Sequence, residues 1–139
     1  MEWLLWAVLS ALFAGATAIL AKVGVAGINS NLATAIRTTV ILLFSWIIAL
    51  VTTRSGEFWS IGKRTWIFLV LSGMATGLSW LCYFRALQLG AISKVAPIDK
   101  LSVVVAMALA ITFLGEKLDL REGIGAGLIV LGAIVLAWK

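Results

Sequence analysis

The segment SKVAPIDKLSVVVAMALAITFLGEK, residues 93–117, joins a charged beginning to a long apolar run. Its residues 101–114 are apolar enough to lie in lipid, but Asp99 stands just before them, next to Lys100. An unpaired charge in the middle of a membrane costs about 2.5–3.5 kcal/mol on insertion scales. We therefore expect Asp99 to meet a basic group or water at one end of a membrane-spanning helix.

The composition of the whole chain is that of a membrane protein. Of the 139 residues, 63% are apolar and 12% are charged, and a typical soluble domain carries about twice that charged fraction. The chain has no histidine and one cysteine, so the sequence predicts no metal site, no cofactor and no intrachain disulfide. Lysine and arginine are scattered at the ends of apolar runs, which favours contact with a lipid bilayer and argues against nucleic-acid binding.

Five apolar segments are long enough to cross a bilayer, whose core needs about 20 residues per helix. They are residues 3–23, 31–52, 66–89, 96–114 and 123–138, with Leu120 as a candidate extension of the last. We predict an all-α integral membrane fold with five transmembrane helices in a single domain, residues 1–139. No basic region precedes the first segment, so we expect a retained helix and not a cleaved signal peptide. Asn31 is the predicted N-cap of the second helix, and Pro97 is predicted in the first turn of the fourth.

The charge distribution leaves the orientation in the membrane open. An odd number of crossings places the two ends of the chain on opposite sides, and both sides hold nearly equal numbers of bases. The side of the N-terminus carries Arg54, Lys63, Arg64, Lys117 and Arg121, and the other carries Lys22, Arg37, Arg85, Lys94, Lys100 and Lys139. This is too small a bias for the positive-inside rule, so one fixed orientation and dual insertion are both compatible with the sequence.

Four of the predicted helices carry a narrow stripe of small or polar residues at helical spacing. The stripes are Ser10, Ala14, Thr17 and Ala21; Thr34, Thr38, Ile41 and Ser45; Ser72, Thr76, Ser79 and Tyr83; and Asp99, Ser102, Ala106 and Ala110. Polar residues in a membrane face other helices or a wet cavity, so the stripes predict either interhelical packing or a cavity wall. The fifth helix instead has Gly123, Gly127 and Gly132, and we expect it to pack closely or to face lipid.

Arg37 and Asp99 are the candidate charged groups of such a cavity. Arg37 lies about 9 Å inside its helix, and its long side chain either snorkels to the interface or faces the cavity. Asp99 and Lys100 are neighbours on a helix and should pair poorly, so we expect Asp99 to pair with Lys22, Arg37 or Arg85. Asp99 then acts either as a structural lock between helices or as an acid that exchanges a proton or a substrate ammonium group. The surrounding bases also suit a solute that carries a carboxylate or a phosphate.

The chain resembles an EamA domain of the drug/metabolite transporter superfamily, most clearly in YFRALQLGAISKVAPIDKLSVVVAMALAITFLGEKLDLREGIGAGLIVLGAIVL, residues 83–136. The matching features are the aromatic end of the third helix, the pair Leu89-Gly90, the motifs VAP and FLGE, and the glycine-rich last helix. The resemblance covers essentially the whole chain, and VAPIDKLSV is most similar to the single-domain, five-helix branch. Ten-helix members resemble two such units in inverted orientation, with the substrate bound between them.

This resemblance implies a transporter that exports small solutes or metabolites across the cytoplasmic membrane. Because the chain has one unit, the resemblance also implies a homodimer, antiparallel if it reproduces the inverted repeat. The alternative is a lipid-handling, flippase-like protein or an accessory membrane subunit, since clustered bases suit a phosphate headgroup. An enzyme is not expected, because no catalytic constellation is present. The candidate substrate or coupling residues are Thr17, Lys22, Thr34, Arg37, Thr38, Thr76, Ser79, Trp80, Tyr83, Arg85, Asp99, Lys100 and Ser102.

Overall fold

The computed structural model describes residues 2–54 and 56–138, and every regular element in these ranges is helical. The elements are α1 (Glu2–Gly24), α2 (Ser30–Thr52), the 3₁₀ turn η1 (Glu57–Ser60), α3 (Lys63–Leu89), α4 (Ile92–Asp99), α5 (Leu101–Leu109), the π-helical turn η2 (Ala110–Leu114) and α6 (Leu120–Ala137). α4, α5 and η2 form one apolar span, so the described chain has five helices able to cross a membrane. The predicted fold class is confirmed.

The second helix is capped by a different asparagine from the predicted one. The side-chain oxygen of Asn29 accepts hydrogen bonds from the backbone N–H groups of Asn31 (2.8 Å) and Leu32 (3.4 Å). Asn29 has the extended backbone that lets a capping side chain turn back onto the first turn, whereas Asn31 already lies inside α2. The prediction of Asn31 as the N-cap is therefore wrong by two residues.

The sequence predicted Pro97 in the first turn of the fourth span. In the structure Pro97 is an interior residue of α4, so this prediction is wrong. Proline has no N–H, so the carbonyl group of Ser93 loses its helical partner. Three residues further on, the Lys100 N–H donates to the Pro97 carbonyl oxygen at 3.1 Å, which is a tighter turn than an α-helix makes. The span is therefore interrupted at Lys100, and Asp99 lies at a break inside the span.

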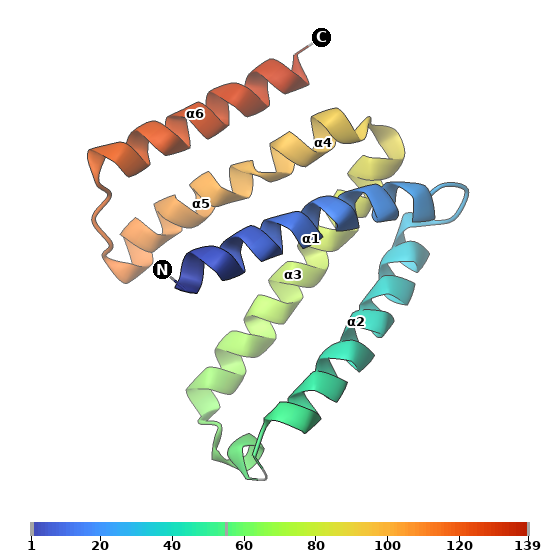
Figure 1. Ribbon diagram of the computed structural model, residues 1–139, viewed down its shortest axis with the longest axis vertical. Helices are drawn as coiled ribbons and strands as arrows, with labels where there is room; N and C mark the ends of the chain where they lie inside the picture. Colours follow the sequence, from blue (N-terminus) through green and yellow to red (C-terminus); the bar gives the residue numbers. More distant parts are fainter. Residues whose placement is uncertain (1, 55, 139) are drawn as a thin grey trace. The chain divides into compact units, whose positions relative to one another are not determined.

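The chain divides into two compact units, and each is described by itself. The first unit contains α1 up to Lys22 together with the chain from Leu89 onward, and the second unit is Val23–Gln88. In the first unit, α6 runs beside α4 and α5 and packs against both (Figure 1). The prediction that residues 1–139 form a single five-helix domain is a separate question from this division, and it stays a prediction.

In the first unit, α6 packs through a face other than the one that holds its glycines. Its least exposed positions include Ala126, Val130, Ala133 and Ala137, which recur at helical spacing. A side chain added at Gly123, Gly127 or Gly132 would meet no atom of the described chain within 4 Å. Within one copy, α6 therefore packs through alanine and valine, and its glycines face open space.

In the second unit, aromatic rings join α2 and α3 beside their connection. The ring of Phe58 in η1 lies 6.3 Å from that of Trp46 in α2 and 5.6 Å from that of Trp66 in α3, measured between centroids. Such offset and edge-to-face pairs stabilise the contact beyond the apolar area that they bury. The ring of Phe58 therefore anchors the α2–α3 connection to both α2 and α3.

At the opposite end of the second unit, Gln88 of α3 holds the connection between α1 and α2. Its side-chain amide donates to the carbonyl oxygens of Val25 (3.3 Å) and Ile28 (2.6 Å). Gly27 has a φ angle of 77°, which glycine adopts without strain and which lets this connection turn. Val25 and Leu87 are almost fully buried, so this end is the best packed part of the unit.

Candidate functional site

The second unit brings Arg37 of α2 against two aromatic rings of α3. The guanidinium carbon lies 4.5 Å from the centroid of the Trp80 ring and 5.5 Å from that of the Phe84 ring. These two rings are four residues apart and so share one face of α3. Tyr83 packs its ring 6.5 Å from that of Phe84. We name these four residues the Arg37 cluster.

The guanidinium group of Arg37 lies well within the span. Arg37 is about 10 Å from the first residue of α2, at 1.5 Å per residue. Trp80 and Phe84 lie about 13 Å and 8 Å before Leu89, the last residue of α3. The two ring contacts hold the guanidinium group against α3, and the choice between an inward-facing and a snorkelling side chain stays a prediction.

Three threonines of the predicted cavity wall bond to their own helices. The Thr34 hydroxyl donates to the Ser30 carbonyl oxygen (2.9 Å), Thr38 donates to Thr34 (2.8 Å), and Thr76 donates to Ser72 (2.9 Å). A hydroxyl that donates to the carbonyl group four residues earlier is satisfied inside one helix. These hydroxyl hydrogens therefore make no bond between helices. Ser79, on the same stripe as Thr76, is exposed.

In the first unit, Lys22 holds the chain where α3 ends. Its ammonium group donates to the carbonyl oxygen of Gly90 at 2.8 Å, and the contact is partly buried. Such a bond fixes the end of α1 to the start of the α3–α4 connection. Thr17, five residues earlier on α1, is half-buried, and Ser102 on α5 is exposed.

In the first unit, Asp99 forms an ion pair with Lys100, the next residue in the sequence. Its carboxylate oxygen lies 3.5 Å from the Lys100 ammonium nitrogen, and the two side chains are 37% and 58% exposed. The sequence analysis expected these neighbours to pair poorly; they are in contact because the helix is interrupted at Lys100 and regular helical spacing no longer applies there. A pair this exposed stabilises a protein little in water. Arg37 and Arg85 belong to the second unit, so their predicted pairing with Asp99 stays a prediction.

Arg85 has a contact within its own helix in the second unit. It donates to the side-chain oxygen of Gln88 at 3.0 Å, one helical turn later. Gln88 and Phe84 carry the contacts of this part of α3 and were not among the predicted site residues. Their spacings from Arg85 and Trp80, three and four residues, are the only signal that the sequence offers for them.

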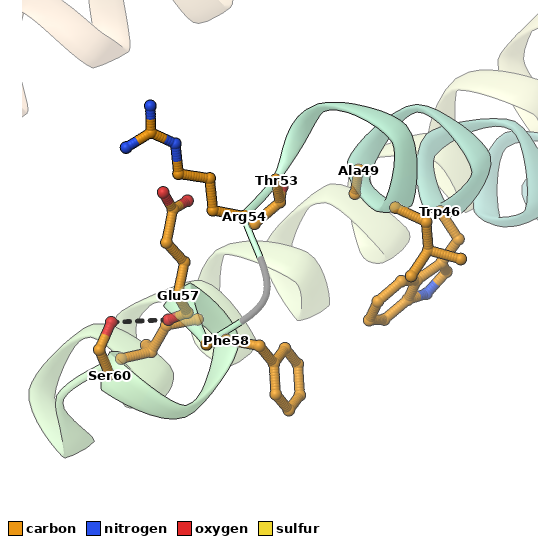
Figure 2. A pocket seen from close by; sticks show the side chains of 10 residues that line it. Trp46, Ala49, Thr53, Arg54, Glu57, Phe58 and Ser60 are labelled. Atoms are coloured by element: carbon orange, nitrogen blue, oxygen red, sulfur yellow. Dashed lines mark hydrogen bonds between the residues drawn. The ribbon is translucent and has the colours of Figure 1, made fainter.

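A cavity of about 820 Å³ opens where α2 meets η1 in the second unit. Figure 2 shows the charged side chains of Arg54 and Glu57 extending together, away from the rings of Trp46 and Phe58. This cavity therefore combines an aromatic wall with charge at the end of a membrane span. No motif in the sequence predicted it, because its residues come from a helix end and a connection.

A model of the EamA-like transporter family matches residues 1–138. The chain belongs to the EamA-like transporter family. This EamA-like chain is 53% identical over 139 residues to the Sinorhizobium sp protein named "Uncharacterized transporter in cobO 3'region", and the match covers 98% of this chain and 96% of that relative. It is 30% identical over 132 residues to "Uncharacterized transporter YxxF" of Bacillus subtilis (strain 168), covering 93% of this chain and 40% of that relative. No solved structure matches it.

The family and the five apolar helices together identify a multi-pass membrane transporter in a lipid bilayer, with a small solute as its expected substrate. The names of the relatives also describe transporters, which points away from an enzyme.

Proposed function

We propose that this EamA-like transporter exports small solutes across the cytoplasmic membrane as a homodimer in which each copy supplies one five-helix unit. The supporting observation is the unequal match to the Bacillus relative. Almost the whole chain, 93%, matches 40% of that protein, so 60% (100 − 40) of its length lies outside the match. The Sinorhizobium relative is matched over 96% of its length, which supports a chain that carries one five-helix domain. A second copy would bring such a chain to the size of the longer relative.

An antiparallel pair is the form of this dimer that inverted repeats suggest. In transporters with such repeats, the substrate site lies at the repeat interface and alternating access follows from rocking of one repeat against the other. Dual insertion requires a weak orientation bias, and the nearly equal base numbers on the two sides meet this requirement.

Single-cysteine labelling tests the arrangement. Cys82 is the one cysteine and is replaced by serine first. Ile28→Cys and Glu57→Cys then place a thiol at each end of the second unit, and intact cells are treated with a membrane-impermeant maleimide. Partial labelling of both variants supports antiparallel copies, whereas full labelling of one and none of the other contradicts them. Light scattering on the purified protein checks the dimer, and a monomer that retains transport activity after reconstitution would contradict it.

Transport direction needs vesicles of known sidedness. An exporter accumulates solute in inverted membrane vesicles and not in right-side-out vesicles, and a proton gradient of either sign reveals coupling. Accumulation restricted to right-side-out vesicles would show uptake instead.

The cavity at the α2–η1 junction favours a second candidate function, the handling of lipids. It lies at the end of a span and joins Arg54 and Glu57 to an aromatic wall, as a lipid headgroup site requires. Reconstituted protein that moves a fluorescent phospholipid between leaflets, without moving soluble solutes, would favour this function over solute export.

A further inference from the structure

We propose that the guanidinium group of Arg37 binds the anionic group of the transported solute, and that this solute is a small organic anion whose carboxylate or phosphate is attached to an apolar body. The inference rests on the proposed solute transport and names its substrate class. It is drawn from the Arg37 cluster, which the comparisons with known proteins do not describe.

The position of Arg37 makes its charge expensive. A cation at the centre of a membrane span costs about 2.5–3.5 kcal/mol on insertion scales, and Arg37 lies about 10 Å inside α2. Membrane arginines are therefore found against protein partners or water-filled paths, where they mark binding sites and ion pathways. Arg37 is half-buried in the second unit, so protein covers part of it.

The aromatic rings compensate only part of this cost. Trp80 and Phe84 lie 4.5 Å and 5.5 Å from the guanidinium carbon, and a cation–π contact contributes about 0.5–2 kcal/mol, depending on how dry it is. Contacts with ring faces also leave the hydrogen-bonding capacity of the guanidinium group unused. The rings therefore fix the position of Arg37 and leave room for a further partner.

The N–H groups of Arg37 have no acceptor in the second unit. Guanidinium carries five donors, and no hydrogen bond or ion pair joins this group to any described residue of 23–54 or 56–88. Arg85, on the facing helix, differs because it donates to Gln88. Arg37 thus combines a fixed position, a full charge and open donors.

These properties define the chemistry of the ligand. The planar guanidinium fork matches the two oxygens of a carboxylate or phosphate, which it binds through paired, charge-assisted hydrogen bonds. The half-buried ring of Trp80 lies directly beside this fork and offers an apolar surface to the rest of the molecule, whereas the ring of Phe84 is almost fully buried and supports Arg37 from within the unit. An organic anion satisfies both halves of the site, whereas inorganic phosphate satisfies one half and an organic cation is repelled.

Binding to the purified full-length protein tests the inference. The probes are benzoate and phenyl phosphate, with acetate and inorganic phosphate as anions that lack an apolar ring, and benzylamine as the cation of similar shape. Affinity is measured by calorimetry for the wild type, Arg37→Gln and Arg37→Lys. We expect Arg37→Gln to weaken benzoate or phenyl phosphate binding about tenfold or more, and Arg37→Lys to recover part of the loss, because lysine keeps the charge and lacks the fork. Circular dichroism and gel filtration identify variants that have not folded.

A matched control is available on α3. Arg64 lies 5.8 Å over the Phe68 ring, which is the same kind of contact at the exposed beginning of a helix, so Arg64→Gln should bind the aromatic anions with unchanged affinity. Asp99→Asn tests the rival partner. If Asp99 competes for Arg37, this variant binds the anions more tightly than the wild type, and the gain disappears when Arg37→Gln is added. A gain that persists in the double variant would place the anion away from Arg37 and overturn the inference.

The outcomes separate this inference from the proposed function. Loss of anion binding confined to the Arg37 variants supports the inference, even if the protein proves to move lipids. Unchanged affinity in Arg37→Gln, or a wild type that binds neither aromatic anion, overturns it. Transport of a solute that these anions do not inhibit would also overturn it, while leaving solute transport intact.

Discussion

The ammonium group of Lys22 donates to the carbonyl oxygen of Gly90 at 2.8 Å, so that a residue near the end of α1 holds the chain just after α3. These two residues are 68 positions apart in the sequence. The contact gives Lys22 a structural role in addition to the solute-binding role that the sequence predicts for it.

Lys22→Met removes this contact and keeps most of the apolar stem. We expect the free energy of unfolding to fall by about 1–3 kcal/mol, since a partly buried carbonyl loses a charged donor. Denaturation in mixed micelles measures the change. Lys22→Arg serves as the control, because it retains a cationic donor of similar reach. Wild-type stability in Lys22→Met, combined with lost transport, would assign Lys22 to the solute and not to the fold.

Gln88→Glu should destabilise the α1–α2 connection. The amide that donates to Val25 and Ile28 becomes a carboxylate, and its oxygens then face two carbonyl oxygens. We expect a loss of about 1–3 kcal/mol in the free energy of unfolding. Arg85→Gln removes only an exposed contact with Gln88 and should cost about 0.5 kcal/mol or less. Equal effects of the two substitutions would contradict the role assigned to the Gln88 amide.

Asp99→Asn separates the two predicted roles of this acid. The pair with Lys100 is exposed, so its loss should change stability by about 1 kcal/mol or less. We expect transport by reconstituted protein to fall to the background rate, while expression and the midpoint of thermal unfolding stay unchanged. Full transport together with lower yield or a lower midpoint would show that Asp99 is a structural lock.

Pro97→Ala should stabilise the fourth span and impair its function. Alanine restores a donor for the Ser93 carbonyl, and interior proline costs a helix about 3 kcal/mol, so thermal stability should stay equal or rise. A continuous helix removes the break at Lys100, and we therefore expect slower transport. Pro97→Gly, which restores the donor but keeps the segment deformable, should retain more transport than Pro97→Ala. A faster Pro97→Ala variant would show that the break has no role.

Gly127→Ile tests whether two copies meet at α6. Gly123 and Gly127 lie one turn apart and face open space within one copy, and such small pairs let membrane helices approach closely. We expect Gly127→Ile to fold normally and to reduce the yield of chemically crosslinked dimer. Gly132→Ile, at another open position, serves as the control. An unchanged crosslinking yield in Gly127→Ile would exclude this face from the interface.

The hydropathy of the sequence was sufficient to predict the five membrane spans, because long apolar runs are visible directly in the sequence. Local boundaries were harder to predict. The choice between Asn29 and Asn31 depends on which backbone is extended, and the place of Pro97 depends on a helix that begins five residues before it, at Ile92. Both are properties of the folded chain and not of residue type.

The site was predictable to the extent that charge and spacing determine it. Arg37, Trp80 and Tyr83 were identified as candidates, and the structure brings Arg37 against Trp80 and Tyr83 against Phe84. Phe84 and Gln88 were missed, because an apolar ring and a neutral amide near a helix end are common in any membrane protein. Their contacts depend on the packing of α2 and of the α1–α2 connection against α3, which no residue spacing within one helix encodes.

The threonines of α2 and α3 have a consequence for any solute that passes them. The side-chain hydroxyl groups of Thr34, Thr38 and Thr76 donate to backbone carbonyl groups of their own helices. These hydroxyl groups can therefore accept a hydrogen bond from a solute but cannot donate one to it. An anion held beside these threonines therefore has to take its hydrogen bonds from other groups, such as the guanidinium group of Arg37. The threonine hydroxyl groups alone give an anion no donor.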